Sequence, residues 1–138
     1  MRVLGLDVGT KKIGVAMSDS TQSIAQGLKV YRRTCLKDDL EEVKRLAEEH
    51  TITEIVIGLP KDLSGTVGKK AQEVMAFAEQ VERYTQIPIV LWDERFSTNE
   101  ANRVFELAQV NHKKRKPFID MIASQIILQG YLDARQTK

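Results

Sequence analysis

Four acidic side chains each stand at one end of an apolar segment of this sequence: Asp7, Asp93, Glu94 and Asp120. An unpaired carboxylate buried among apolar residues would be destabilising, and its pKa would rise. A bound cation or a set of hydrogen-bond donors would remove that cost. If these segments converge in the fold, their carboxylates could bind a divalent cation together.

Each acid also has a simple structural interpretation. Asp7 could cap a turn, Asp93 and Glu94 could be an exposed pair at a strand end, and Asp120 could be favoured by the dipole at a helix N-terminus. The arrangement of the strands separates the two interpretations. If the first, fourth and fifth strands are parallel, their carboxyl ends share one edge of the sheet, and Asp7 comes near Asp93 and Glu94.

The segment Arg2–Ala16 predicts a β-hairpin that places the first acid. Two apolar runs flank a turn that contains Gly9, Lys11 and Lys12, and both runs are apolar at almost every position. This pattern indicates a sheet covered on both faces. The glycines of the hairpin would allow a ligand or another backbone to approach Asp7 closely: Gly5, Gly9 and Gly14.

The rest of the chain alternates between helix and strand periodicity. We expect a strand at 23–33 with a bulge at Gly27, a helix at 36–50, a strand at 55–58 ended by Pro60, a helix at 69–85, a strand at 89–92, a helix of about a dozen residues from Ser97, and a helix at 117–132. The apolar stripes of these helices are predicted to be core, and the charged face of 36–50 is predicted to be solvated. Gly58 would lie where the fourth strand passes the acidic edge.

Two clusters of basic residues could contact phosphates through charge. Lys69 and Lys70 begin a predicted helix after a loop rich in Gly, Ser and Thr, and a denser run occupies the predicted loop 112–116. Its cations are Lys113, Lys114, Arg115 and Lys116. Such a run can also serve only solubility, so the nearby acids are what favour phosphate contact.

Composition limits the classes of protein to consider. The chain has 138 residues, 42% hydrophobic and 29% charged, with a net charge of +2, which predicts one globular domain spanning 1–138. No leader or membrane-length apolar run is evident, so we expect a cytoplasmic protein. Cys35 stands alone, and His50 and His112 are isolated, so any bound metal would have oxygen ligands.

Over nearly its whole length the sequence resembles the YqgF/RuvX family of proposed pre-16S rRNA nucleases and Holliday-junction-resolvase-like proteins. The resemblance is carried by the segments 7–16, 58–60 with Gly65 and Thr66, 93–98 with Glu100 and Ala101, and Asp120 with Ala123. It implies an α/β, RNase H-like fold with a five-stranded mixed sheet, the order β-β-β-α-β-α-β-α and helices on both faces.

Carried over to this sequence, the family's acidic site falls on Asp7, Asp93, Glu94 and Asp120. The implied cofactor is Mg²⁺ or Mn²⁺, as two ions, because carboxylates without His or Cys select hard cations. Asp7 would be shared by both ions, with Glu94 and Asp120 completing the site; Glu94 is favoured over Asp93 for its reach. The substrate backbone would be bound by Arg95 and the loop lysines, including Lys11 and Lys12.

The implied activity is phosphodiester hydrolysis in 5′-end processing of pre-16S rRNA, by a monomer or a weak homodimer. Resolution of branched DNA, a non-catalytic RNA-binding module and a structural ribosome-assembly factor are the alternatives. The first motif also resembles the phosphate-binding hairpin of actin-like ATPases and sugar kinases. Those proteins enclose a nucleotide between two lobes, and this chain is too short to form both.

Overall fold

A computed structural model of the chain describes residues 1–60, 68–93 and 112–136, of which 112–120 and 136 are described by their backbone alone. Five strands form one sheet in the order β3-β2-β1-β4-β5. The elements are β1 (Arg2–Val8), β2 (Lys12–Ser18), β3 (Ala25–Arg32), α1 (Leu36–Glu49), β4 (Ile52–Leu59), α2 (Lys69–Thr85), β5 (Ile89–Asp93) and α4 (His112–Gln136). The predicted hairpin, strands and first two helices are confirmed within a few residues, and the helix predicted from Ser97 lies outside the described residues.

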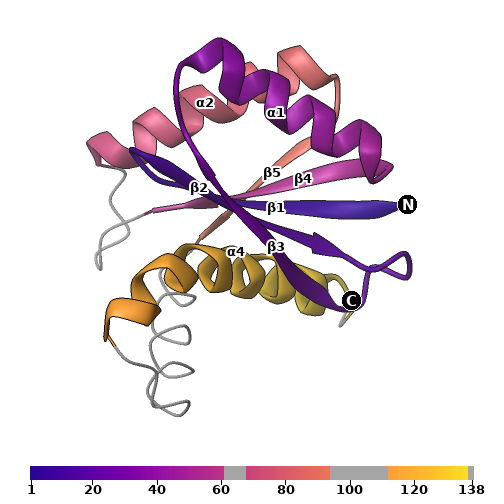
Figure 1. Cartoon of the computed structure of the whole chain (residues 1–138). Coiled ribbons are helices and arrows are strands. Elements are labelled where there is room, and N and C mark those ends of the chain that lie inside the picture. The colour runs from indigo at the N-terminus through magenta and orange to yellow at the C-terminus, as the bar shows by residue number, and fades with distance from the viewer. Residues whose placement is uncertain (61–67, 94–111, 137–138) are drawn as a thin grey trace.

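The sheet is mixed, as expected. β1 pairs in parallel with β4, and β4 in parallel with β5, whereas β2 is antiparallel to both β1 and β3. α1 and α2 cover one face and α4 crosses the other, so the sheet is the middle of three layers (Figure 1). The carboxyl ends of β1, β4 and β5 therefore lie at one edge of the sheet, as the clustering of the acids requires.

The continuous apolar runs of the central strands have the predicted cause, because side chains on both faces are buried. Leu4, Leu6 and Ile57 belong to a core cluster with α1 and α2, whereas Val3 and Val56 pack with residues of α4. Successive residues point to opposite faces of a strand, so this division assigns a face to every position of β1 and β4.

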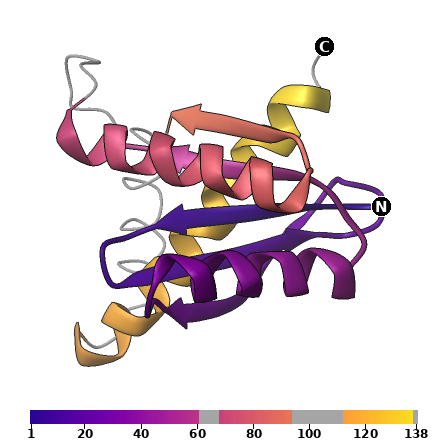
Figure 2. The same cartoon turned by 90° about the horizontal axis from the view of Figure 1, so that it is seen from above.

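The helices α1 and α2 lie side by side over their face of the sheet (Figure 2). The interpretation of the α2 stripe as core holds for Ala71, Val74, Phe77, Ala78 and Val81. It is wrong for Met75 and Tyr84, which are 42% and 37% exposed. The buried positions already span the stripe that a helix can press against a sheet, and both residues lie at its margins.

The helix α4 begins earlier than the sequence predicted. It runs from His112, so the basic run 112–116 is helical and the prediction of a basic loop is wrong. Pro117 lies inside α4, and Asp120 is not in its first turn. Lys and Arg are good helix formers, so the basic run extends the helix before Pro117, where the missing N–H costs one intrahelical hydrogen bond.

α4 crosses the sheet where the strands carry small residues. A Cβ added at Gly5 would lie 2.8 Å from Leu128 Cβ, and one added at Gly27 would lie 2.7 Å from Met121 Cγ. The bulge predicted at Gly27 lies next to it: Val15 pairs with Lys29 and Ala16 with Gly27, so Leu28 has no partner in β2.

Among the described residues, no helix combines the length and the apolar character that crossing a membrane requires.

Candidate active site at the carboxyl edge of the sheet

Asp7 occupies the next-to-last position of β1 and is partly buried. It alternates in phase with Val3, which packs with α4, so the Asp7 side chain lies on the α4 face. Its antiparallel partner is Gly14. On the other side Gly58 follows Ile57, the parallel partner of Leu6, and so stands beside Asp7.

The two flanking glycines shape the surroundings of Asp7. Neighbouring strands are about 4.8 Å apart, so a side chain at either position would fill the space beside the carboxylate. Both glycines are buried, and with no side chain at either position another group can approach the Asp7 carboxylate closely. Close approach to an oxygen donor is what the hard cation implied by the sequence would require.

The same alternation places Asp93 on the opposite face. Its partner in β4 is Leu59, which belongs to the α1 and α2 core, and Ile89, four residues earlier in β5, packs on that core. Asp7 and Asp93 thus lie at the same edge of the sheet but face opposite layers. Glu94 follows Asp93 and lies outside the described residues.

Asp120 belongs to α4, and only its backbone is described. Position 120 lies one turn before Ser124, and residues four apart share a helix face. The carbonyl oxygen of Ser124 would be 3.3 Å from a Cβ at Gly5, two residues before Asp7. The backbone of α4 at position 120 is therefore on the layer that covers Asp7. Among the described side chains, no group of three His, Cys, Asp or Glu residues is arranged to hold a metal ion.

Two aromatic residues secure the end of β5 against α4. Trp92 and Tyr131 contact edge to face, with ring centroids 5.8 Å apart and planes at 77°. The Tyr131 hydroxyl donates to Glu54 Oε1 over 2.7 Å. Burial, followed by the bond to Glu54, raises the pKa of Tyr131 above its usual 10.0. These contacts fix the strand that leads into Asp93 and Glu94.

The turn after β1 carries two of the predicted nucleic-acid contacts, Lys11 and Lys12. The Gly9 N–H donates to the carbonyl of Lys12 over 2.8 Å, and a Cβ at Gly9 would lie 2.9 Å from that oxygen. The tight closure explains the glycine. Lys11 is exposed and Lys12 is partly exposed, as phosphate contact would require.

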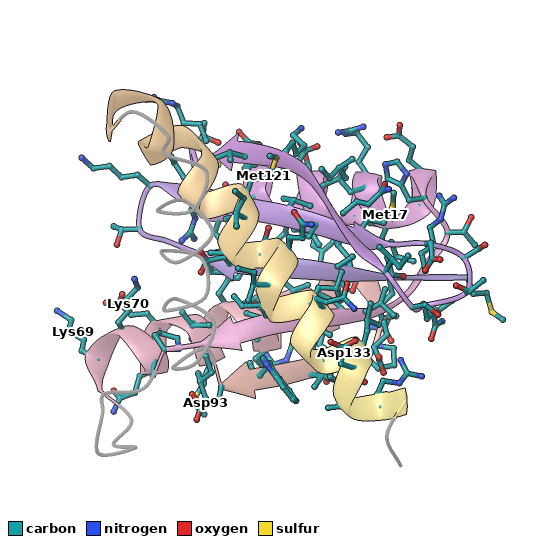
Figure 3. The ribbon with its side chains drawn as sticks, turned by 90° about the horizontal axis from the view of Figure 1, so that it is seen from below. Met17, Lys69, Lys70, Asp93, Met121 and Asp133 are labelled. Atoms are coloured by element: carbon teal, nitrogen blue, oxygen red, sulfur yellow. The ribbon has the colours of Figure 1, made fainter. Side chains whose placement is uncertain are left out.

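Two adjoining hollows lie beneath this turn, on the α1 and α2 face. The smaller hollow has a volume of about 170 Å³, and its lining includes Thr10, Arg33 and Lys70. The larger hollow has a volume of about 550 Å³, and its lining includes Thr10, Lys11 and Arg33. Lys69 and Lys70 are exposed at the start of α2 and lie on the same side of the molecule as Asp93 (Figure 3). Basic side chains of the described residues thus lie near the acidic edge, together with Glu73, which lines both hollows.

Sequence reasoning missed Arg33 and Asp39, which form a salt bridge of 2.9 Å beside the turn. Asp39 is 2% exposed. The available signal was its spacing, because Asp39 lies four residues before Val43 on the apolar stripe of α1. A carboxylate at a stripe position predicts a buried partner.

Comparison with known proteins agrees with this geometry in two steps. The solved structures similar to the chain define its class as the RuvC-like RNase H fold. Thermus thermophilus RuvC in complex with a Holliday junction substrate matches with a TM-score of 0.64 and 13% identity, covering 100% of this chain and 97% of that one. The resolvase of fowlpox virus, in complex with its substrate Holliday junction DNA, matches with a TM-score of 0.61 and 13% identity over 98% and 99% of the two chains.

The sequence identifies the family. The model of the RuvX family, described as Holliday junction resolvase, matches residues 1–134, and the chain belongs to this family. A protein of Thermoanaerobacter pseudethanolicus is 48% identical over 139 residues, covering 100% of both chains. One of Carboxydothermus hydrogenoformans is 50% identical over 133 residues, covering 96% of both. Each is named "Putative pre-16S rRNA nuclease".

Proposed function

We propose that this protein is a metal-dependent nuclease that hydrolyses phosphodiester bonds in the 5′-end processing of pre-16S rRNA. The observation that carries the proposal is the setting of Asp7, a strand-end carboxylate placed between Gly14 and Gly58 on the face that α4 covers. The names of the relatives that cover the whole chain supply the substrate.

The proposed ligands are Asp7, Glu94 and Asp120, which would hold Mg²⁺ or Mn²⁺. Glu94 is preferred to Asp93 because Asp93 shares a face with Leu59, opposite to Asp7. Bound hard cations would supply activation of a water and stabilisation of the leaving oxygen. The chain itself contributes strand ends that carry its carboxylates and, at Gly14 and Gly58, positions that allow close approach to Asp7.

The basic residues would bind and orient the substrate without reading its sequence. Lys and Arg neutralise phosphates wherever the backbone passes, so they act on affinity and alignment. The proposed contacts are Lys11, Lys12, Lys69, Lys70, Arg95, Lys113, Lys114, Arg115 and Lys116. Those of the segment 113–116 belong to a helix, which presents them at fixed spacing along α4.

A second candidate is the resolution of branched DNA, which the description of the family model favours. The two functions share the metal chemistry and differ in the shape of the nucleic acid. We therefore propose to incubate the purified protein with a precursor-like RNA and, separately, with a four-way DNA junction, each with Mn²⁺, Mg²⁺ or a chelator.

Metal-dependent cleavage at the 5′ side of the mature RNA end, with the junction left intact, is the expected result. Cleavage of the junction alone would identify the resolvase. Binding of RNA without cleavage under any of these conditions, together with the same thermal midpoint with and without Mn²⁺, would contradict a nuclease and favour an RNA-binding assembly factor.

A further inference from the structure

An ion pair between a partly buried arginine and a buried aspartate lies beside the candidate site and includes none of its proposed metal ligands. Arg33 follows β3, and its Nε donates to Asp39 Oδ2, on α1, over 2.9 Å. The Asp39 side chain is 2% exposed and that of Arg33 is 23% exposed. The guanidinium also lies over the ring of Phe77, on α2, with 5.0 Å between the Arg33 Cζ and the ring centroid. Both helices of this layer therefore hold Arg33 in place.

Arg33 uses this fixed position to hold the turn after β1. Its Nη1 donates to the carbonyl of Gly9 over 2.8 Å. Its backbone N–H donates to the carbonyl of Lys11, also over 2.8 Å. One residue therefore fastens the chain on both sides of Thr10. A guanidinium can do this because its fork of donors reaches a carboxylate and a carbonyl at once.

The bonds from Arg33 to the turn also restrain the end of β1 that carries Asp7. Asp7 with Gly14, and Val8 with Ile13, are the last two pairs between β1 and β2. These pairs adjoin the turn, so their geometry depends on the conformation of the turn, and the glycine partner adds no side-chain packing to hold the Asp7 pair together. A metal ligand must nevertheless stay within about 0.5 Å of its productive position.

We propose that Arg33 is a positioning residue for Asp7, locked by Asp39 and acting through the carbonyls of Gly9 and Lys11. This inference rests on the proposed function, in that Asp7 is taken as a metal ligand. Arg33 lies on the α1 and α2 face and Asp7 on the α4 face, so the effect passes through the backbone of the turn. Arg33 is assigned no contact with metal or substrate.

The variant Arg33→Lys tests this role because it keeps a cation beside Asp39 but removes the fork. The affinity for Mn²⁺ should weaken and kcat for RNA cleavage should fall, each by about 10-fold to 100-fold, as for other outer partners of a metal site. The KM for RNA should stay within about twofold, since no phosphate contact changes. Amide hydrogen exchange at 9–12, measured without metal, should become faster.

A matched control is Lys29→Arg. Lys29 also joins β3 to α1, through a 2.7 Å salt bridge with Glu42, but it does not bind the turn in the described structure. This variant should leave Mn²⁺ affinity, kcat and the exchange rates at 9–12 unchanged. If Arg33→Lys does not fold, the double variant Arg33→Gln with Asp39→Asn removes both charges of the pair and should show the same losses.

Three results would overturn the proposal. Faster exchange at 9–12 with normal Mn²⁺ affinity and kcat would show that the turn is held without consequence for Asp7. A higher KM alone would show that the bonds from Arg33 to the turn position Lys11 and Lys12 for substrate binding, and not Asp7. A wild-type protein that neither binds Mn²⁺ nor cleaves RNA would contradict the proposed function itself. This failure is seen in wild type alone, so it is distinguished from a failure of the proposal about Arg33.

Discussion

Asp7 on β1 and Gly14 on β2 are direct cross-strand partners, so the candidate metal ligand faces a residue without a side chain. On the other side of Asp7, β4 also has a residue without a side chain, Gly58. In the middle of a sheet, cross-strand side chains normally fill this space and stabilise the pair. Gly14 and Gly58 are buried but contribute no side chain beside the Asp7 carboxylate, so these positions allow another group to approach it closely.

The first prediction concerns the charge of Asp7. Asp7→Asn keeps the size of the side chain but removes the charge that would hold the cations, so metal-dependent cleavage should fall by about 10³-fold or more. The thermal midpoint without metal should be unchanged or higher, because repulsion from the other acids is lost. RNA affinity should be kept. Cleavage assays, thermal unfolding with and without Mn²⁺ and RNA titration check these outcomes.

The result that would make Asp7 a structural turn residue is a joint one. The variant would lose stability, while wild type showed neither stabilisation by Mn²⁺ nor cleavage. Asp93→Asn is the internal comparison. Because Asp93 faces the other layer, its substitution should reduce cleavage far less than that of Asp7.

The second prediction concerns the closest approach of α4 to the sheet. In Gly5→Ala the new Cβ would lie 2.8 Å from Leu128 Cβ, which is too short, so α4 must shift. We expect a loss of roughly 1–3 kcal/mol in the free energy of unfolding. Urea denaturation measures it. Gly68→Ala is the control, since nothing lies within 4 Å of a Cβ there, and equal losses in both variants would exclude overpacking as the cause.

The third prediction concerns the lysines at the start of α2. No acid stands in the first turn of this helix, so Lys69 and Lys70 add to the positive end of its dipole. Replacing both with Gln should lower the slope of log affinity against log salt for single-stranded RNA by about 1.4. The paired substitution of Lys37 and Lys44, exposed on α1, should leave the slope unchanged. Equal slopes in all three proteins would make the α2 lysines an ordinary solvated surface.

The fourth prediction concerns the segment 113–116. Four substitutions to Ala preserve helix propensity, so α4 should stay folded while its phosphate contacts are lost. The salt slope for single-stranded RNA should fall by up to roughly 3. Circular dichroism checks that helix content is kept. If the slope is that of wild type, the basic run of α4 does not contact nucleic acid.

The fifth prediction concerns acid stability. A hydrogen bond from Arg45, with further bonding and charge from Lys29, lowers the pKa of Glu42 below its usual 4.5. A lowered folded-state pKa stabilises the protein above pH 4.5, and this contribution is lost as the pH falls through the lower value. Glu42→Gln should therefore cost roughly 0.5–1 kcal/mol at pH 7 and nothing at pH 2. Urea denaturation at both pH values measures the difference, which an equal cost at both would contradict.

The sequence by itself determined most of the fold, because periodicity and turn chemistry act over a few residues. The apolar runs around Asp7 predicted a sheet covered on both faces, and the stripe of 69–85 predicted α2 within its bounds. The parity of Asp7 with Val3 was also correct, since alternation along a strand is a local property. The start of α4 was missed because a basic run next to a proline suits both a loop and a helix.

The tertiary structure decided on which face of the sheet each acid lies and which residues hold the turn after β1. Asp7 and Asp93 share an edge but face opposite helices, and only strand register and packing establish this. The glycines beside Asp7 become meaningful because pairing brings Gly14 and Gly58 to the same level from distant parts of the chain. Arg33 shows the same limit. Its three bonds go to residues 6, 22 and 24 positions away, and no local pattern records contacts that depend on the packing of α1 against a turn.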